Sequence, residues 1–279
     1  MGIAWESGLL AGLAERGVDV STADFIVGTS AGAFVGAELA LGRSPGEIAE
    51  PDLKGTIPVR ASQGPPPDLT TLIMKMIEAA SGKRPAEEVR AEIGAWALKT
   101  AAIAEDEFIA RFAPWLGGEA DGAWPRKSFA CTAVDAADGS FLVWNHESGV
   151  GLARAVASSC AVPGIFPPIT IRGRRYIDGG MRSATNADLA KGYNAVMVVA
   201  VTLKSVPAFI SDVFRKRFEA EIQTLRASAD RVEVIVPDDA SNQAFGMNLM
   251  DASRRQPSAQ AGLEQGRREA ARLAGFWAG

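Results

Sequence analysis

The sequence is poor in several residue types, and each shortage limits what the protein can be. Among its 279 residues there are two cysteines, one histidine and two tyrosines, and the formal net charge is −4. Two cysteines cannot build a disulfide scaffold, and they suit a reducing compartment. A chain without a basic excess is not expected to bind nucleic acid, and the short basic stretch at residues 172–175 does not change that.

Long apolar runs are also missing. No segment approaches the roughly 18 consecutive apolar residues of a membrane-spanning helix. The sequence does not open with a basic stretch followed by an apolar one, as secretory leaders do. We therefore expect a cytoplasmic protein. Its acidic charge gives no strong attraction to anionic lipid surfaces, so any membrane contact should be transient and made through apolar side chains.

What the chain does contain is a serine motif between an apolar run and an Ala-rich segment. Residues 28–32 have the pattern G-x-S-x-G. The pattern predicts a tight turn with strained backbone angles at Ser30, where Gly28 and Gly32 remove side chains that would collide. The N–H groups that open the following helix, among them that of Ala31, can stabilise an oxyanion beside the hydroxyl. The alternative is an ordinary glycine-rich turn that carries a solvated serine.

The rest of the pattern predicts an α/β fold. Helices that alternate with strands on both sides of the serine motif favour one domain over residues 1–279, with three α/β/α layers. The apolar run at residues 195–203 is typical of a strand buried on both faces. Other predicted strands cover residues 25–28, 128–135, 140–145, 169–171, 175–177 and 231–237. Predicted helices cover residues 3–16, 31–41, 153–159, 187–192, 210–227 and 259–276.

Residues 63–120 are expected to form a helical insertion over the sheet. Three segments have apolar residues at helical spacing, namely 69–80, 86–100 and 105–112. Residues 42–67, which lead into them, have the composition of a loop that ends in a stiff proline run. The stripe of Met and Ile in the insertion could line a lipid cleft, although a stripe of this kind more often serves plain packing.

A catalytic serine needs a group that takes its proton. His146, the one histidine, could serve with an acid from residues 31–145, but no residue is marked out as that acid, and a partly exposed structural histidine explains it as well. Asp178 is the better candidate, because it follows an apolar strand and precedes two glycines that leave its carboxylate reachable. A carboxylate can take the proton as the C–O bond forms if the oxyanion is held well. The alternative is an aspartate that only caps a turn.

With Ser30 and Asp178 both identified, the chain resembles the patatin-like phospholipases, serine lipid acyl hydrolases that use a Ser-Asp dyad. The resemblance rests on residues 28–32, on residues 178–180 and on residues 157–163, which are similar to the family's A-S-x-x-x-P segment. It implies the patatin-like sandwich fold, Ser30 as the nucleophile and Asp178 as the base. It also implies a fatty-acyl ester, such as a phospholipid, as the substrate, and neither a metal nor an organic cofactor.

One part of the family pattern has no counterpart here. The family opens with a strand and a loop of the form G-G-G-x-x-G, whose N–H groups make the oxyanion hole, and only Gly2 matches it. Each missing donor costs about 2.7–4 kcal/mol of transition-state stabilisation. We expect the true start to lie upstream of Met1, and a shortened, impaired member is the alternative. The candidate oxyanion and turn residues are Gly2, Gly28, Ala31, Gly32, Gly179 and Gly180.

The sequence leaves three functional hypotheses. The first is a serine acyl hydrolase that forms an acyl-enzyme on Ser30. The second is a catalytically impaired lipid-binding or interaction protein of the same fold, which the missing glycine loop favours. The third, a phosphate-binding loop at residues 27–32, is disfavoured because no lysine follows Gly32.

Overall fold

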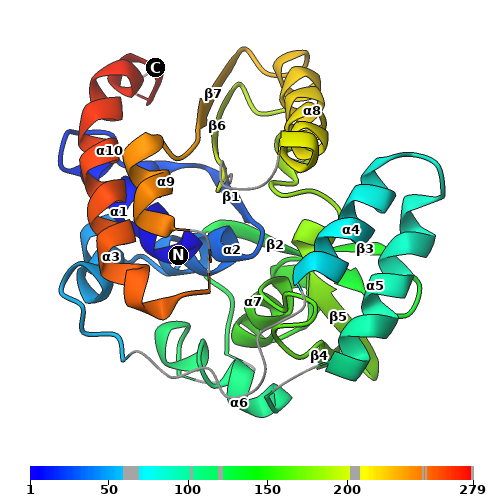
Figure 1. Ribbon diagram of the computed structural model, residues 1–279. Coiled ribbons are helices and arrows are strands. Elements are labelled where there is room, and N and C mark those ends of the chain that lie inside the picture. Colours follow the sequence, from blue (N-terminus) through cyan, green and yellow to red (C-terminus); the bar gives the residue numbers. More distant parts are fainter. Residues whose placement is uncertain are drawn as a thin grey trace.

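The structure is a computed structural model that describes residues 1–58, 69–100, 103–118, 122–201, 208–246, 248 and 250–277. Within these residues the strands form two sheets (Figure 1). The larger contains β1 (Phe25–Gly28), β2 (Ser128–Asp135), β3 (Phe141–Trp144), β4 (Ile169–Ile171) and β5 (Arg174–Asp178). The smaller pairs β6 (Ala195–Val199) with β7 (Arg231–Ile235) in parallel.

Helices cover both sheets, and most of them match the predicted segments. Short 3₁₀ helices include η3 (His146–Ser148) after β3, η4 (Gly179–Met181) after β5 and η5 (Ala187–Ala190) before β6. None of the helices in the described part of the chain is both long and apolar enough to cross a bilayer. The α-helices are α1 (Gly2–Ala14), α2 (Ala31–Ala40), α3 (Pro45–Leu53), α4 (Leu69–Ala80), α5 (Ala86–Thr100), α6 (Glu105–Ile109), α7 (Leu152–Ser159), α8 (Ala208–Arg226), α9 (Asp239–Phe245) and α10 (Arg255–Trp277).

The larger sheet lies between two helical layers, as the sequence predicts. Successive side chains of a strand point to opposite faces. Cys131 and Ala133 of β2 pack into a core with α2 and α7, whereas Val134 packs with α4 and α5 on the other face. The three segments expected in the helical insertion are helical and form α4, α5 and α6. α6 ends at Ile109, before the predicted Phe112.

The smaller sheet is covered in the same way but is more open than predicted. Val196 and Val198 of β6 pack against α8, while Met197 and Val199 contact the core around α1 and α10. The prediction of a strand buried on both faces over residues 195–203 is wrong in extent and burial. The strand ends at Val199, and its residues alternate between buried and half-buried, because α8 covers Val196 and Val198 fully whereas the face that carries Met197 and Val199 is only partly covered. Residues 202 and 203 lie outside the described residues.

A second correction concerns residues 42–67. The sequence predicted a loop there, but Pro45–Leu53 form α3. The Ser44 hydroxyl accepts the N–H of Glu47, and the Glu47 carboxylate accepts the N–H of Ser44, which is a capping box with proline at the first helical position. The proline run that follows lies outside the described residues.

α1 and α10 pack unusually closely, and Figure 1 shows them side by side. Gly8 and Gly12 of α1 and Gly262 and Gly266 of α10 lie at the contact. A Cβ added at Gly8 would be 2.0 Å from the carbonyl oxygen of Ala259, and additions at the other three would come equally near the opposite backbone. Because these residues carry no side chain, the two helices approach backbone to backbone.

Gly262→Ala is therefore expected to lower the free energy of unfolding by about 1–3 kcal/mol, because the new methyl group would lie 2.3 Å from the carbonyl oxygen of Trp5. Gly275→Ala, in the same helix, is the matched control. A Cβ there meets nothing within 4 Å, so the better helix propensity of alanine should raise stability by up to about 1 kcal/mol. Urea unfolding of both variants tests this, and equal losses would contradict the close packing.

Candidate active site

The serine of the G-x-S-x-G motif lies on a sharp turn between β1 and α2. Ser30 is half-buried and has φ 55° and ψ −117°, a left-handed conformation that few residues other than glycine adopt. Gly28 is required by the turn, because a Cβ there would be 2.3 Å from the carbonyl oxygen of Gly32. The same reasoning fails for Gly32. A Cβ at that position would come no nearer than 4.0 Å to the Glu6 carboxylate, which is ordinary contact.

Strand pairing brings Ser30 and Asp178 to the same place. Cys131 of β2 pairs with both β1 and β3, so these two strands lie on opposite edges of β2. Ala133 of β2 pairs with both β3 and β5, so β5 lies on the same edge as β1. Since β1 runs parallel and β5 antiparallel to β2, their carboxyl ends face each other beside Thr132. The two residues, far apart in the sequence, therefore converge along one strand edge.

Asp178 is buried, with 2% of its surface exposed. Its Oδ1 accepts the N–H of Gly180 at 2.7 Å, whereas Oδ2 has no hydrogen-bond partner among the described residues. Burial raises the pKa of Asp178 to about 7, and the Gly180 N–H and the nearby Ser30 hydroxyl oppose that rise. The result is a carboxyl group that changes its protonation near neutral pH, with a free oxygen beside a serine.

Residues at the end of α7 hold the backbone around Ser30. In the sequence, this segment stands out only through the family resemblance of residues 157–163. The Ser159 hydroxyl accepts the N–H of Ser30 at 3.1 Å, and the Cys160 thiol donates to the Ser30 carbonyl oxygen at 3.1 Å. Burial raises the pKa of Cys160 well above its usual range, so it stays a neutral thiol donor. Ser159 is the last residue of α7 and Cys160 follows it. Both position the Ser30 backbone, a role that the sequence did not predict.

The N–H groups at the turn are not equally available to a substrate. That of Gly32 is bonded to the Thr29 carbonyl oxygen at 3.1 Å, and that of Ser30 is bonded as described. The N–H of Ala31 has no hydrogen bond within the described part of the chain. Gly2 lies beside it, because a Cβ added at Gly2 would be 3.2 Å from the Ala31 Cβ. The amino ends of α1 and α2 thus meet next to Ser30.

A buried polar cluster links the serine turn to the aspartate turn, and no motif in the sequence predicts it. The Thr29 and Thr132 hydroxyls lie 2.8 Å apart, and the Asn186 amide donates to Thr29 at 3.0 Å and to the Gly179 carbonyl oxygen at 3.3 Å. Asn186 is itself left-handed, with φ 50°. Gly179 fits only without a side chain, since a Cβ there would be 2.1 Å from the Thr132 hydroxyl.

The other candidates from the sequence lie elsewhere or have other partners. His146 is in η3, its side chain is 69% exposed, and its nearest charged neighbour is Glu147 at 3.8 Å. Gly180 holds the Asp178 carboxylate rather than standing free as an oxyanion donor. In the described residues there is no group of three or more His, Cys, Asp or Glu side chains that could hold a metal ion.

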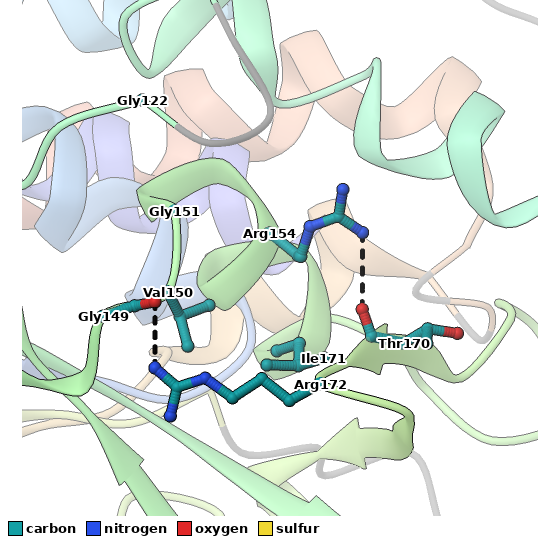
Figure 2. Close-up of a pocket in the computed structure, with 8 residues that line it drawn as sticks. All are labelled: Gly122, Gly149, Val150, Gly151, Arg154, Thr170, Ile171 and Arg172. Atoms are coloured by element: carbon teal, nitrogen blue, oxygen red, sulfur yellow. Dashed lines mark hydrogen bonds between the residues drawn. The ribbon is translucent and has the colours of Figure 1, made fainter.

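Two cavities lie close to the strands and helices described above, one beside α7 and β4 and the other beside β1, α2 and β6. The one in Figure 2 has a volume of about 500 Å³, and Arg154 and Arg172 at its rim donate to backbone carbonyl oxygens of the cavity wall. It is lined by Gly122, Gly149, Val150, Gly151, Arg154, Thr170, Ile171 and Arg172. The other is a groove of about 610 Å³ that includes Gly32 and Glu6. Neither Ser30 nor Asp178 lines either cavity.

Comparison with known proteins gives one family. A model described as patatin-like phospholipase matches residues 1–191. Among solved structures, the chain is similar to VipD from Legionella pneumophila, with a TM-score of 0.44 and 11% sequence identity. That similarity covers 97% of this chain and 65% of the VipD chain, so this chain spans less than two thirds of that length. No curated protein matches the sequence.

Proposed function

The chain belongs to the patatin-like phospholipase family, and from that premise we propose that it hydrolyses fatty-acyl esters of lipids with Ser30 as nucleophile and Asp178 as general base. One observation carries the proposal, which is the unpartnered Oδ2 of a buried carboxyl group beside the Ser30 hydroxyl. A buried oxygen without a partner costs free energy, so its presence in a folded protein calls for a functional explanation. Accepting the serine proton is a task that fits.

In the proposed acylation step, Ser30 Oγ forms a bond to the ester carbonyl carbon while its proton passes to Oδ2 of Asp178. The carbonyl oxygen becomes an oxyanion, which the Ala31 N–H and the amino ends of α1 and α2 stabilise. When the tetrahedral intermediate collapses, the C–O bond to the alcohol breaks and Asp178 returns the proton to the leaving oxygen. An acyl-enzyme on Ser30 remains.

Deacylation repeats these steps with water. Asp178 takes a proton from the water as the water oxygen attacks the acyl carbon, and then returns a proton to Ser30 Oγ as the fatty acid leaves. The Gly180 N–H occupies Oδ1, which leaves the unpartnered Oδ2 to take and return the proton in both steps.

Labelling by a fluorophosphonate tests this proposal directly, because the reagent reacts with activated serines. The expected result is one label, which mass spectrometry locates on Ser30 and which Asp178→Asn removes. A label on another serine, or none in a folded protein, would overturn the nucleophile assignment.

A second candidate function rests on the small number of free donors. With the Ser30 and Gly32 N–H groups already bonded, Ala31 supplies the one unbonded N–H of residues 30–32, as far as contacts among the described residues go. Each missing oxyanion donor costs about 2.7–4 kcal/mol, so a lipid-binding protein without turnover is the competing proposal. It predicts association with phospholipid vesicles and no labelling, whereas ester turnover would exclude it.

The pH dependence of the reaction follows from the pKa of about 7 at Asp178. Only the deprotonated carboxylate accepts the serine proton, so kcat/KM for an uncharged ester should rise up to about pH 7 and then level off. The raised pKa also means that the folded state binds this proton more tightly than the unfolded chain. The stability that protonated Asp178 contributes to the folded state is therefore lost as the pH rises from 3.8 through about 7. A rate profile that is flat across this range, in protein shown to be folded by circular dichroism, would contradict the role of Asp178.

A further inference from the structure

Asn186 lies between the two turns that carry the proposed reacting groups. It is fully buried, and its backbone is left-handed, with φ 50°. Its Nδ2 donates to Thr29 Oγ1 at 3.0 Å and to the Gly179 carbonyl oxygen at 3.3 Å. Thr29 precedes Ser30 in the chain. Gly179 follows Asp178, so one side chain is bonded to both turns. A buried polar side chain on a strained backbone persists only where its surroundings hold it in place.

A charged neighbour fixes the orientation of the Asn186 amide. Arg182 donates from Nη1 to Asn186 Oδ1 at 2.9 Å. Arg182 is itself held by two hydrogen bonds to the Asp188 carboxylate, at 2.8 and 2.7 Å. An amide turned the other way would place its N–H groups against the guanidinium, donor against donor. The Asn186 Nδ2 therefore faces Thr29 and Gly179, and both of these partners offer it an oxygen.

The backbone on both sides of Asn186 is held from a distant helix. Glu221 of α8 accepts the Ala187 N–H and the Thr185 hydroxyl on the same carboxylate oxygen, Oε1. Its Oε2 accepts the Ser183 hydroxyl, whose oxygen in turn accepts the Asn186 N–H at 3.1 Å. Three donors from residues 183–187 thus meet on one carboxylate. α8 fixes the segment that carries Asn186, although Glu221 follows Ala187 by 34 positions in the chain.

The closeness of the two turns also determines the pKa of Asp178. Burial raises this pKa to about 7, against the effects of the Gly180 N–H and the Ser30 hydroxyl. The Cys160 thiol lies within electrostatic reach of the carboxyl group, and burial raises its own pKa well above the usual range, so it is uncharged near pH 7. Since none of these neighbours is charged, the exclusion of water is what keeps the pKa of Asp178 high. Turns that move apart would admit water and lower it.

We propose that Glu221 and Asn186 are positioning residues of the active site. Glu221 holds the segment of residues 183–187 to α8, and Asn186 on that segment sets the distance between the Ser30 and Asp178 turns. Proton transfer needs the reacting oxygens in hydrogen-bond contact, and a displacement of about 1 Å costs on the order of a hundredfold in rate. The inference rests on the proposed function, since it takes Ser30 and Asp178 as the reacting groups. The competing explanation is a polar cluster that only stabilises the fold.

The first test removes the carboxylate of Glu221. In Glu221→Ala, kcat for a p-nitrophenyl ester and the rate of fluorophosphonate labelling should fall by about ten- to a hundredfold, with KM changed by less than about twofold. Glu221→Gln should restore most of both rates, because the amide keeps one oxygen for the two Oε1 donors and its N–H groups can donate to the Ser183 hydroxyl oxygen. Glu219→Ala is the matched control. Glu219 is exposed on the same helix and contacts Arg215, so neither rate should change.

Asn186→Gly is the second variant, and it leaves the backbone free to remain left-handed. It removes the amide and should lower both rates to the same extent as Glu221→Ala. An NMR titration of the labelled Asp178 carboxyl group provides a readout that needs no turnover. The pKa of Asp178 should fall from about 7 toward 3.8 in both variants, and it should stay at about 7 in Glu221→Gln and Glu219→Ala.

The outcomes separate this inference from the proposed function. If the unaltered, folded chain is not labelled on Ser30, the proposed function fails, whereas a lowered pKa of Asp178 in the two variants still supports the positioning role. A pKa that stays at about 7 in both variants would overturn that role, and so would equal losses in Glu221→Gln and Glu221→Ala. If Glu221→Ala does not fold, Asn186→Gly gives the same readouts. Failure of both to fold would mean that the cluster serves the fold itself, which also overturns the proposal.

Discussion

Ser30→Ala and Asp178→Asn are each expected to reduce hydrolysis of a short-chain p-nitrophenyl ester by at least about a thousandfold. The first variant removes the attacking oxygen. The second keeps the size of the side chain and an oxygen for the Gly180 N–H, but an amide cannot take up the serine proton. Because both groups act in the same step, the double variant should be no slower than either single one.

Two surface variants serve as controls for this experiment. Ser81→Ala and Asp106→Asn change the same residue types at exposed positions in the helical insertion, and both should retain full activity. Circular dichroism and thermal melting separate loss of chemistry from loss of fold. Full activity in a folded Ser30→Ala or Asp178→Asn protein would rule out the dyad.

Gly28→Ala is expected to have the largest effect on stability, a loss of about 3 kcal/mol or more. The added Cβ would lie 2.3 Å from the Gly32 carbonyl oxygen and 2.5 Å from the Ala33 nitrogen. Both are backbone atoms of the turn and cannot move without displacing Ser30. Ester hydrolysis should therefore be lost together with stability.

Gly32→Ala is the matched comparison, since both glycines belong to the same five-residue motif. A Cβ at Gly32 makes only ordinary contact, at 4.0 Å from the Glu6 carboxylate. This variant should stay folded and keep activity within a fewfold of the unaltered chain, as measured by urea unfolding and by the ester assay. Equal losses in the two variants would show that the turn needs both glycines after all.

The local parts of the fold and the site could be predicted from the sequence because they depend on local chemistry. The strand-to-helix turn at Ser30, the hairpin of β2 and β3 and the strand that ends at Asp178 all follow from periodicity and turn residues. α3 could also have been predicted. The capping box that begins at Ser44 has a recognisable spacing, but the nearby glycines and prolines favoured a loop.

The parts that the sequence did not predict depend on which strands pair. That β5 lies antiparallel on the same edge of β2 as β1 is a matter of tertiary packing, and it determines how Asp178 reaches Ser30. The contacts of Ser159 and Asn186 depend on that arrangement, as does the groove beside β6. No spacing within a single segment encodes them, so the sequence did not predict the residues that hold the turns in place, whereas its motifs did single out Ser30 and Asp178, the proposed reacting groups.

The head-on meeting of β1 and β5 has a consequence for the protein while it is being made. The ribosome releases Ser30 long before Asp178, because the two lie on opposite sides of the helical insertion and of β2. Until β5 docks, Ser30 lacks the proton acceptor that we propose for it. If Ser30 and Asp178 act together as proposed, the protein would stay inert during its own translation and become reactive only when most of the chain has folded.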